Sequence, residues 1–446
     1  MYHYIMPLSR DNERFAAEFM RANGIFLSGK AFSARNIAKA ARVWYNRNMR
    51  KTSVKGAAAL LLALVMTLAA FGCGDGVTGR TYNITGYFGT TVTFAVYRAA
   101  DAESDALAVR DEIESMLAEV SAAADAQTEG SDVARFNAAG AGERVELSVT
   151  GYALFSLAME MYEQTGGLYD PSVGLSVDLW GFTPRFTLPD YAPERAYDRE
   201  SANVPPADEY VEAFRGLIGF GDVILYEENG KYYAVKPDRT ATVAGDDTVY
   251  TMNVDLGGIA KGYAADRAAE IAERHGLTES YVSVGRSSLA LGDNRESAEG
   301  APREHMWAVS VAHPRTDGAT WLRVYAAREC VSTSGDYERA YIYDGKRYCH
   351  VIDPRTGRPV DSSVASVTLL GRTAAEADAL TTALVVMGRE AATEYVNARL
   401  TDARVAICED ADGLTMYTNM PETDYDLVAS DVALGSRAED GKIIVL

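Results

Sequence analysis

The sequence has little of the chemistry that binds nucleic acid or zinc. Its 446 residues include 43 lysines and arginines against 63 aspartates and glutamates, which gives a formal net charge of −20. Binding to a phosphate backbone requires a basic face, so this excess of negative charge argues against nucleic acid as a partner. The four cysteines form no CxxC pair and no zinc-binding pattern.

A long membrane-spanning segment is also missing, because the apolar run at residues 57–71 is too short to cross a bilayer comfortably. Basic residues precede this run, and Cys73 follows it. The order resembles a bacterial lipoprotein signal at residues 49–72, with Cys73 lipidated as the first residue of the mature chain. The alternative is an uncleaved membrane anchor. Either interpretation predicts an extracytoplasmic protein attached to the cell membrane, by lipid in the first case.

Residues 1–48 stand before this signal, where a signal is normally the start of the chain. They are either an over-extended reading frame, with Met49 as the true start, or a cytoplasmic N-terminal segment. The folded body is then expected at residues 73–446.

The body is globular by composition, with 48% hydrophobic and 24% charged residues. Residue spacing predicts strands at 90–97, 281–284, 307–312, 321–327 and 364–370. It predicts helices at 105–124, 148–165, 261–275 and 374–387, the last one stopped by Gly388, and a surface loop at 183–209. The uneven placement of the helices favours an α+β class, a single large body of mixed or antiparallel sheets flanked by helices.

The stretch VDLGGIAKGYAAD, Val254–Asp266, has paired glycines at a predicted strand-to-helix turn. It matches neither the dinucleotide fingerprint nor the P-loop. Its helix start would offer free N–H groups and Lys261 a full positive charge, which suits a phosphate. A tight connection whose glycines only ease packing explains the same residues equally well.

Two further stretches hold aromatic and polar residues. In GGLYDPSVGLSVDLWGF, Gly166–Phe182, an Asp-Pro turn precedes Trp180 and Phe182, which are either core or a flank for a flat ring system. In STSGDYERAYIYDGKRYCHVIDPRTGRPV, Ser332–Val360, a hairpin is predicted with His350 on its return strand. A single strand histidine is more often structural, but nearby Ser334, Asp336 and Tyr337 favour a functional cluster.

The apolar helix AAEADALTTALVVMG, Ala374–Gly388, carries Asp378 and Thr382 four residues apart, on one face. Two oxygen donors facing inward suit a hard cation such as Mg²⁺. The alternative is an exposed Asp378 whose carbonyl accepts a hydrogen bond from the Thr382 hydroxyl.

Together, LYDPSVG…LWGF, DLGGIAKGYAAD, TSGDYER…DGK…HVIDPRTG and ADALTTALVVMG resemble, in content and order, the FAD:protein FMN transferase family, the ApbE family. The resemblance covers residues 87–420. It implies transfer of FMN from FAD to a threonine or serine hydroxyl of a partner protein, with release of AMP and a requirement for Mg²⁺. It further implies export as a lipoprotein, in agreement with Cys73, and an exported acceptor with an S/T-G-A-T-like motif.

The resemblance assigns roles to individual residues. Asp255 and Lys261 are expected to bind FAD, and Leu168, Tyr169 and Asp170 to contact the flavin nucleotide. The Gly258 carbonyl, Asp378 and Thr382 are expected to hold the metal. His350 is the expected proton acceptor, with Asp378 assisting; Phe88 is the remaining FAD-binding candidate.

Three places depart from the family pattern: Phe88 replaces a common methionine, Gly285-Arg286-Ser287 a usual G-G-N, and Ala122–Ala124 a tyrosine that often packs on the flavin. These changes bear on flavin affinity more than on chemistry. Two other functions stay open, a Mg²⁺-dependent FAD pyrophosphatase producing FMN and AMP, and a non-catalytic exported flavin-binding lipoprotein.

Overall fold

The computed structural model describes residues 77–99, 103–182, 204–294 and 303–446. The predictions for residues 1–48, the signal at 49–72 and Cys73, and most of the loop at 183–209, lie outside these residues. The chain divides into two compact units, and the second, Tyr82–Phe94 with Asp105–Leu446, holds every site residue discussed below.

Most strands of a nine-stranded sheet lie in the second unit. Its order is β1-β2-β8-β9-β12-β17-β18-β19-β21, and the pairings from β8 to β19 are antiparallel, whereas β19 and β21 run parallel. The strands are β1 (Val77–Tyr87), β2 (Thr90–Ala99), β8 (Ser280–Val284), β9 (Ser288–Leu291), β12 (Cys330–Gly335), β17 (Val364–Leu370), β18 (Arg404–Asp410), β19 (Leu414–Thr418) and β21 (Val432–Leu434). Every residue of β17 is buried, as expected of a central strand covered on both faces.

Smaller sheets and hairpins surround this sheet. One three-stranded sheet contains β3 (Arg144–Leu147), β5 (Lys231–Val235) and β4 (Ile224–Glu228), and another contains β10 (Trp307–Ala312), β11 (Thr320–Ala326) and β20 (Tyr425–Leu427). The two-stranded pairs are β6 (Thr240–Ala241) with β7 (Tyr250–Thr251), β13 (Ala340–Tyr343) with β14 (Lys346–Cys349), β15 (Ile352–Asp353) with β16 (Arg358–Pro359), and β22 (Ser436–Glu439) with β23 (Lys442–Val445).

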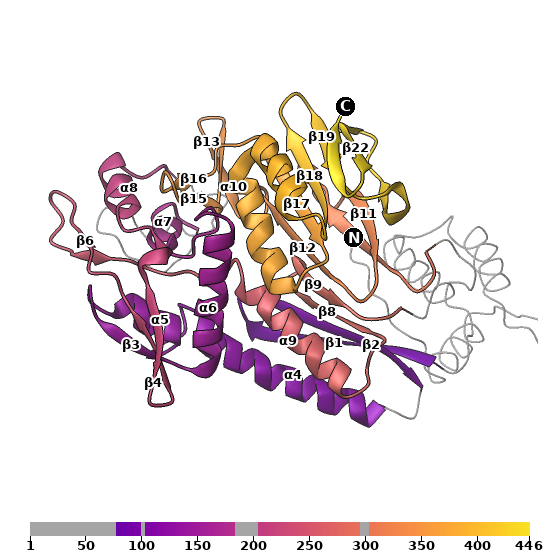
Figure 1. Ribbon diagram of the computed structural model, residues 1–446, viewed down its shortest axis with the longest axis horizontal. Coiled ribbons are helices and arrows are strands. Elements are labelled where there is room, and N and C mark those ends of the chain that lie inside the picture. Colours follow the sequence, from indigo (N-terminus) through magenta and orange to yellow (C-terminus); the bar gives the residue numbers. More distant parts are fainter. Residues whose placement is uncertain (1–76, 100–102, 183–203, 295–302) are drawn as a thin grey trace, which may run out of the picture. The chain divides into compact units, whose positions relative to one another are not determined.

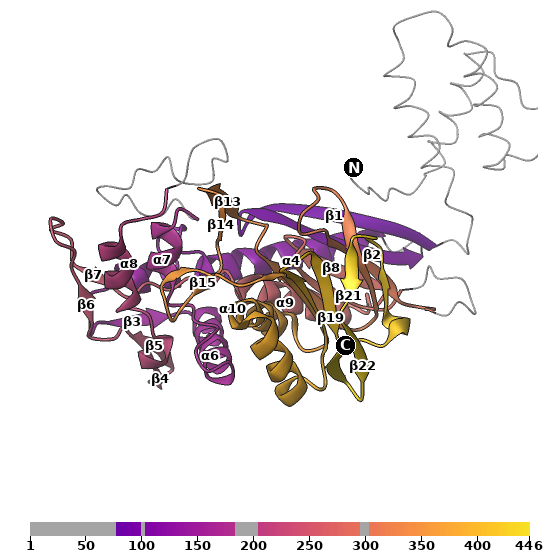
Figure 2. The same cartoon turned by 90° about the horizontal axis from the view of Figure 1, so that it is seen from above.

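Two helices pack on this sheet: α9 (Ala260–Arg274) on β8 and β9, and α10 (Ala374–Arg399) on β12 and β17 (Figure 1). The two helices also pack on each other (Figure 2). A Cβ on Gly262 would lie 2.1 Å from the Ala374 carbonyl oxygen, so only glycine permits this crossing. The other helices are α4 (Glu103–Ala124), α5 (Asp132–Ala138), α6 (Val149–Gln164), α7 (Gly174–Leu179) and α8 (Asp208–Arg215).

The α+β prediction is confirmed, with one large sheet flanked by helices. Gly388 (φ 77°) ends the first helical segment of α10, as predicted, and a second segment continues beyond this kink to Arg399. Two other predicted boundaries are wrong. The strand before the glycine pair ends at Thr251, not within residues 254–256, and only Asn253 forms a further bridge, to Val173. The end of the loop predicted at 183–209 is helical, since α8 begins at Asp208.

Within the described ranges, no helix combines the length and apolarity needed to cross a membrane. The three cysteines in these ranges, Cys330, Cys349 and Cys408, are buried free thiols. Burial raises the pKa of the Cys349 and Cys408 thiols to about 12. The described body therefore depends on packing and hydrogen bonds rather than on disulfides.

Candidate active site

The glycine-pair loop lies beside the LYDPSVG segment. The Asp255 N–H donates to the Pro171 carbonyl (2.7 Å), and the Gly174 N–H donates to the Asn253 carbonyl (3.1 Å). Between these two bonds, Val173 and Asn253 form a parallel bridge. Two of the motifs, separated in sequence, are thus joined through backbone hydrogen bonds.

Gly258 stands where the loop meets α10. A Cβ at this glycine would lie 3.3 Å from Cε2 of Tyr169 and 3.6 Å from the Thr382 hydroxyl oxygen. Tyr169 is 3% exposed, and among the described residues its phenol oxygen has no hydrogen-bond partner. Burial, and then the charges of Asp378 and Asp255, raise the pKa of this phenol well above its usual value. The phenol therefore stays protonated, as a donor for a group bound in the site.

Asp378 is 3% exposed, so the alternative in which it faces solvent is wrong. Its Oδ2 accepts from the Gly262 N–H (3.2 Å) and lies 3.9 Å from the Lys261 ammonium. Its Oδ1 accepts from the Ser332 hydroxyl at 3.3 Å. The other half of that alternative is present, since the Thr382 hydroxyl donates to the Asp378 carbonyl at 3.1 Å.

These groups fit a small hard cation. Asp378 and Thr382 supply a carboxylate and a hydroxyl, and Gly258 lies against Thr382. The described residues contain no cluster of three or more histidine, cysteine, aspartate or glutamate side chains suited to a metal. A site with one carboxylate and neutral oxygens matches the way Mg²⁺ is held, with few protein ligands and the rest from phosphate and water.

The helices α9 and α10 cap each other. No side chain at its own N-cap bonds to α9, but Asp378 of α10 accepts from the third N–H of its first turn, that of Gly262. In return, Asp266 of α9 accepts from the Ala374 and Ala375 N–H groups (2.8 and 2.9 Å) that begin α10. Two helix N-termini therefore meet near Lys261, each with a carboxylate of the other helix bound to N–H groups of its first turn.

The cap made by Asp266 should depend on pH. Burial raises the pKa of this carboxyl from 3.8 to about 6. Because the folded pKa lies above the unfolded one, the group's contribution to the free energy of unfolding falls as the pH rises from about 4 to about 6. Asp266→Asn removes this ionisation. The unfolding free energy of the wild-type protein minus that of the variant, from urea titrations, is expected to decline across this window; two parallel pH profiles would contradict the prediction.

His350 lies just beyond β14, which ends at Cys349, so its predicted place within the return strand is wrong. Its N–H donates to the Arg339 carbonyl (2.9 Å), and its ring Nδ1 is buried. Burial, then the positive charges of Arg339 and Lys261, hold the pKa of the imidazole well below its usual value. The ring is therefore neutral near pH 7 and able to accept a proton.

Two members of the cluster predicted around His350 bond to other residues. The Ser334 hydroxyl lies 2.9 Å from that of Thr381 and 3.4 Å from that of Thr382, beside Asp378. Asp336 instead forms a two-bond ion pair with Arg315 (2.7 and 2.9 Å). Ser334 thus belongs to the site, whereas Asp336 anchors the segment that carries it.

Comparison with known proteins assigns the family. The family model described as the ApbE family matches residues 88–407. This chain belongs to the ApbE family. It is 30% identical over 313 residues to the FAD:protein FMN transferase of Vibrio cholerae, an alignment that covers 70% of this chain and 80% of that protein. It is 32% identical over 246 residues to that of Escherichia coli K12, covering 54% of this chain and 60% of that protein.

The fold agrees with this assignment. The solved structure of the flavin transferase ApbE from Vibrio cholerae superposes with a TM-score of 0.59 at 27% identity, covering 77% of this chain and 97% of that chain. The recognition made from the four motifs is therefore confirmed.

The ApbE resemblance also assigned nucleotide contacts to Asp170, Leu168 and Phe88. Asp170 is buried, and its carboxylate accepts from Ser172 and from the Phe220 N–H. Leu168 is half-buried, and Phe88 is half-buried at the β1–β2 turn with φ 53°. Their assigned contacts with the nucleotide stay predictions; the structure gives Asp170 a clear role in fixing its own turn.

The Arg286 departure lies near the expected FAD site. The preceding Gly285 (φ 65°) would bring a Cβ within 3.5 Å of the Lys261 Cδ and 3.1 Å of Thr90. Arg286, Lys261 and Arg339 each counter the rise that burial causes in the pKa of Glu338. Positive charge is thus concentrated at this point of an acidic chain. The alanines at the end of α4 include buried Ala123 and Ala124.

Sequence reasoning missed Ser332, Asp266 and Glu338 as members of the site. Ser332 bonds to Asp378, and Asp266 bonds to the first N–H groups of α10. Glu338 interacts with the charges of Lys261, Arg339 and Arg286. All three stand inside the quoted stretches, but their partners are remote in sequence. Their roles could not be read from local spacing.

Proposed function

We propose that this protein transfers FMN from FAD to a threonine or serine hydroxyl of a partner protein and releases AMP. The observation that carries the proposal is the convergence of Asp378, Thr382 and Gly258 beside Lys261, where two helix N-termini meet. Phosphoryl transfer requires positioning and charge neutralisation rather than covalent chemistry by the protein. The site supplies both in one place.

Different residues of the site would bind Mg²⁺ and the parts of FAD. Asp378, Thr382 and the Gly258 carbonyl would hold Mg²⁺, which when bound would neutralise charge on the pyrophosphate of FAD. Lys261 adds positive charge beside Asp378. Asp255 and the LYDPSVG segment bind the rest of FAD, and the protonated phenol of Tyr169 donates to the bound group.

In the transfer step, the acceptor hydroxyl oxygen forms a bond to the FMN-side phosphorus. The bond from that phosphorus to the bridging oxygen breaks, and AMP leaves with this oxygen. His350 takes the hydroxyl proton, since its imidazole is neutral near pH 7. Asp378 assists through its charge.

We further propose that the acceptor is an exported protein with an S/T-G-A-T-like motif. The lipoprotein-like order of residues 49–73 supports a lipid anchor at Cys73 and a place outside the cytoplasm. Labelling cells with a radioactive fatty acid tests the anchor. Cys73→Ala is expected to lose the label, and a label retained by this variant would exclude the proposed anchor site.

The transfer itself is tested by incubating the protein with FAD, MgCl₂ and a peptide containing the S/T-G-A-T motif. Covalent FMN on the peptide, detected by mass spectrometry, and AMP in equal amount are the expected result. AMP released equally without peptide, and no adduct, would instead identify a FAD pyrophosphatase. Flavin binding without AMP release would identify a non-catalytic flavin-binding protein.

A further inference from the structure

The loop that carries Asp255 and Gly258 begins at a residue with no strand partner. The preceding strand β7 ends at Thr251, and the only bridge beyond it is at Asn253. Val254 follows, fully buried. Its backbone N–H and carbonyl must be satisfied without water, and no sheet is available to do this.

A single side chain satisfies both groups. The Asn137 amide oxygen accepts from the Val254 N–H at 2.7 Å, and the Asn137 amide nitrogen donates to the Val254 carbonyl at 2.9 Å. Asn137 lies in α5, more than a hundred residues earlier in the chain. One amide thus takes the place of a neighbouring strand at the entrance to the loop.

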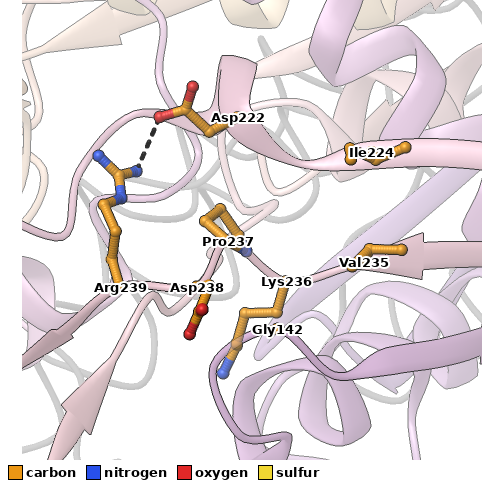
Figure 3. Close-up of a pocket in the computed structure, with 8 residues that line it drawn as sticks. All are labelled: Gly142, Asp222, Ile224, Val235, Lys236, Pro237, Asp238 and Arg239. Atoms are coloured by element: carbon orange, nitrogen blue, oxygen red, sulfur yellow. Dashed lines mark ion pairs between the residues drawn. The ribbon is translucent and has the colours of Figure 1, made fainter.

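A buried lysine holds Asn137 in turn. The Lys236 ammonium donates to the carbonyls of Asn137 and Ala139 (2.9 and 2.8 Å) and to the Thr251 hydroxyl (2.8 Å). It therefore joins the end of α5 to the strand that leads into the loop. Lys236 follows directly after β5, and Figure 3 shows it among the residues that line a cavity of about 350 Å³, where Asp222 and Arg239 form an ion pair (3.2 Å).

We propose that Asn137, fixed by Lys236, is a positioning residue that sets the place of the FAD-binding loop. The proposal rests on the proposed function, since it assigns FAD to this loop. Displacing Val254 would shift Asp255, whose own N–H bonds to Pro171, and Gly258 four residues on. A misplacement of about 1 Å in a catalytic site can cost about 100-fold in rate.

The lysine is costly to bury. It is 1% exposed, and within the part of the chain that the structure describes no carboxylate bonds to its ammonium. Burial lowers the pKa of the ammonium to about 8. A group that opposes folding in this way is consistent with selection for the geometry it imposes rather than for stability.

The chain offers a matched control far along the sequence. Asn397 of α10 makes the same two bonds to a single residue, Ile443: its amide oxygen accepts at 2.7 Å and its amide nitrogen donates at 3.0 Å. Asn137 and Asn397 are both half-buried. Removing either amide removes one such pair of bonds, but only Asn137 holds a residue, Val254, that directly precedes the loop.

The test compares Asn137→Ala, Asn397→Ala and Lys236→Met in the full chain. Each variant's melting temperature is measured, together with its FAD dissociation constant from flavin fluorescence without Mg²⁺. We expect Asn137→Ala and Lys236→Met to raise the FAD dissociation constant about tenfold or more, and Asn397→Ala to change it by less than about twofold at a similar loss of melting temperature. The turnover number at saturating FAD and Mg²⁺ is expected to fall in Asn137→Ala and to remain in Asn397→Ala.

Two results would overturn the inference. One is wild-type FAD affinity and turnover in folded Asn137→Ala; the other is an equal loss in Asn137→Ala and Asn397→Ala, which would indicate general destabilisation. Failure of the proposed function has a different signature, a wild-type protein that neither binds FAD nor releases AMP. If Lys236→Met does not fold, Asn137→Ala and Asn397→Ala still decide the question.

Discussion

Replacing Asp378 with asparagine is expected to lower kcat/KM for FMN transfer by about 1,000-fold. The amide oxygen of asparagine can still accept from the Gly262 N–H, and its amide nitrogen can donate to the Ser332 hydroxyl oxygen, so the shape of the corner is kept. What is removed is the negative charge that lies 3.9 Å from Lys261 and that would hold the metal. AMP release at saturating FAD, and Mn²⁺ binding followed by electron paramagnetic resonance, measure the effect.

Ser332→Ala is the matched control for Asp378→Asn, because it removes one hydrogen bond to the carboxylate and leaves its charge in place. A loss of less than about tenfold is expected, since this bond is long at 3.3 Å. If Asp378→Asn retained activity within tenfold of the wild type and bound Mn²⁺ normally, the metal-binding role of Asp378 would be excluded.

Replacing His350 with glutamine is expected to reduce kcat by about 100-fold to 10,000-fold at pH 7, the usual range for a lost general base. Burial and the charges of Arg339 and Lys261 lower the pKa of His350, so the wild-type ring stays neutral from pH 7 down past its ordinary value of 6.5. Activity that depends on this base is therefore expected to persist below pH 6.5 and to be lost only as the ring is protonated. The pH profile of kcat/KM in the wild-type protein and the variant measures both effects.

His305→Gln serves as the control histidine variant, because this side chain is 60% exposed and belongs to a different loop. It should leave the rate and the pH profile unchanged. If the His350→Gln protein kept the wild-type rate, the proton acceptor would be another group. If kcat/KM fell at the same acidic pH in both proteins, His350 would not be the group whose protonation causes that loss.

Local sequence patterns predicted the elements of the site better than their connections. The four-residue spacing of Asp378 and Thr382 predicted a shared helix face, and the glycine pair predicted a turn before α9; both are present. The β17 boundaries were predicted to the residue, because β-branched and apolar residues fill that strand throughout. Gly388 ends the first helical segment of α10 as predicted, but the second segment, which continues to Arg399, was not predicted.

The connections depend on pairs that are distant in sequence. Asn137 bonds to Val254, and Asp266 bonds to Ala374, only when the chain is folded. No local sequence pattern predicts either pair. Strand β12, which carries Ser332 and Ser334, was not predicted, although it pairs with β9 and β17 inside the large sheet. The order of strands in that sheet could not be predicted, because it results from packing over the whole body.

The mutual capping of α9 and α10 has a consequence for how the site forms. The first turn of each helix is completed by a carboxylate from the other, across 108 to 116 residues of chain. Neither helix start can be fully satisfied until both are in place, so the first turn of α9 and the first turn of α10 belong to one cooperative unit. Amide hydrogens at both helix starts should then exchange with solvent together, in a single opening event, and a half-assembled site is not a stable state of this fold.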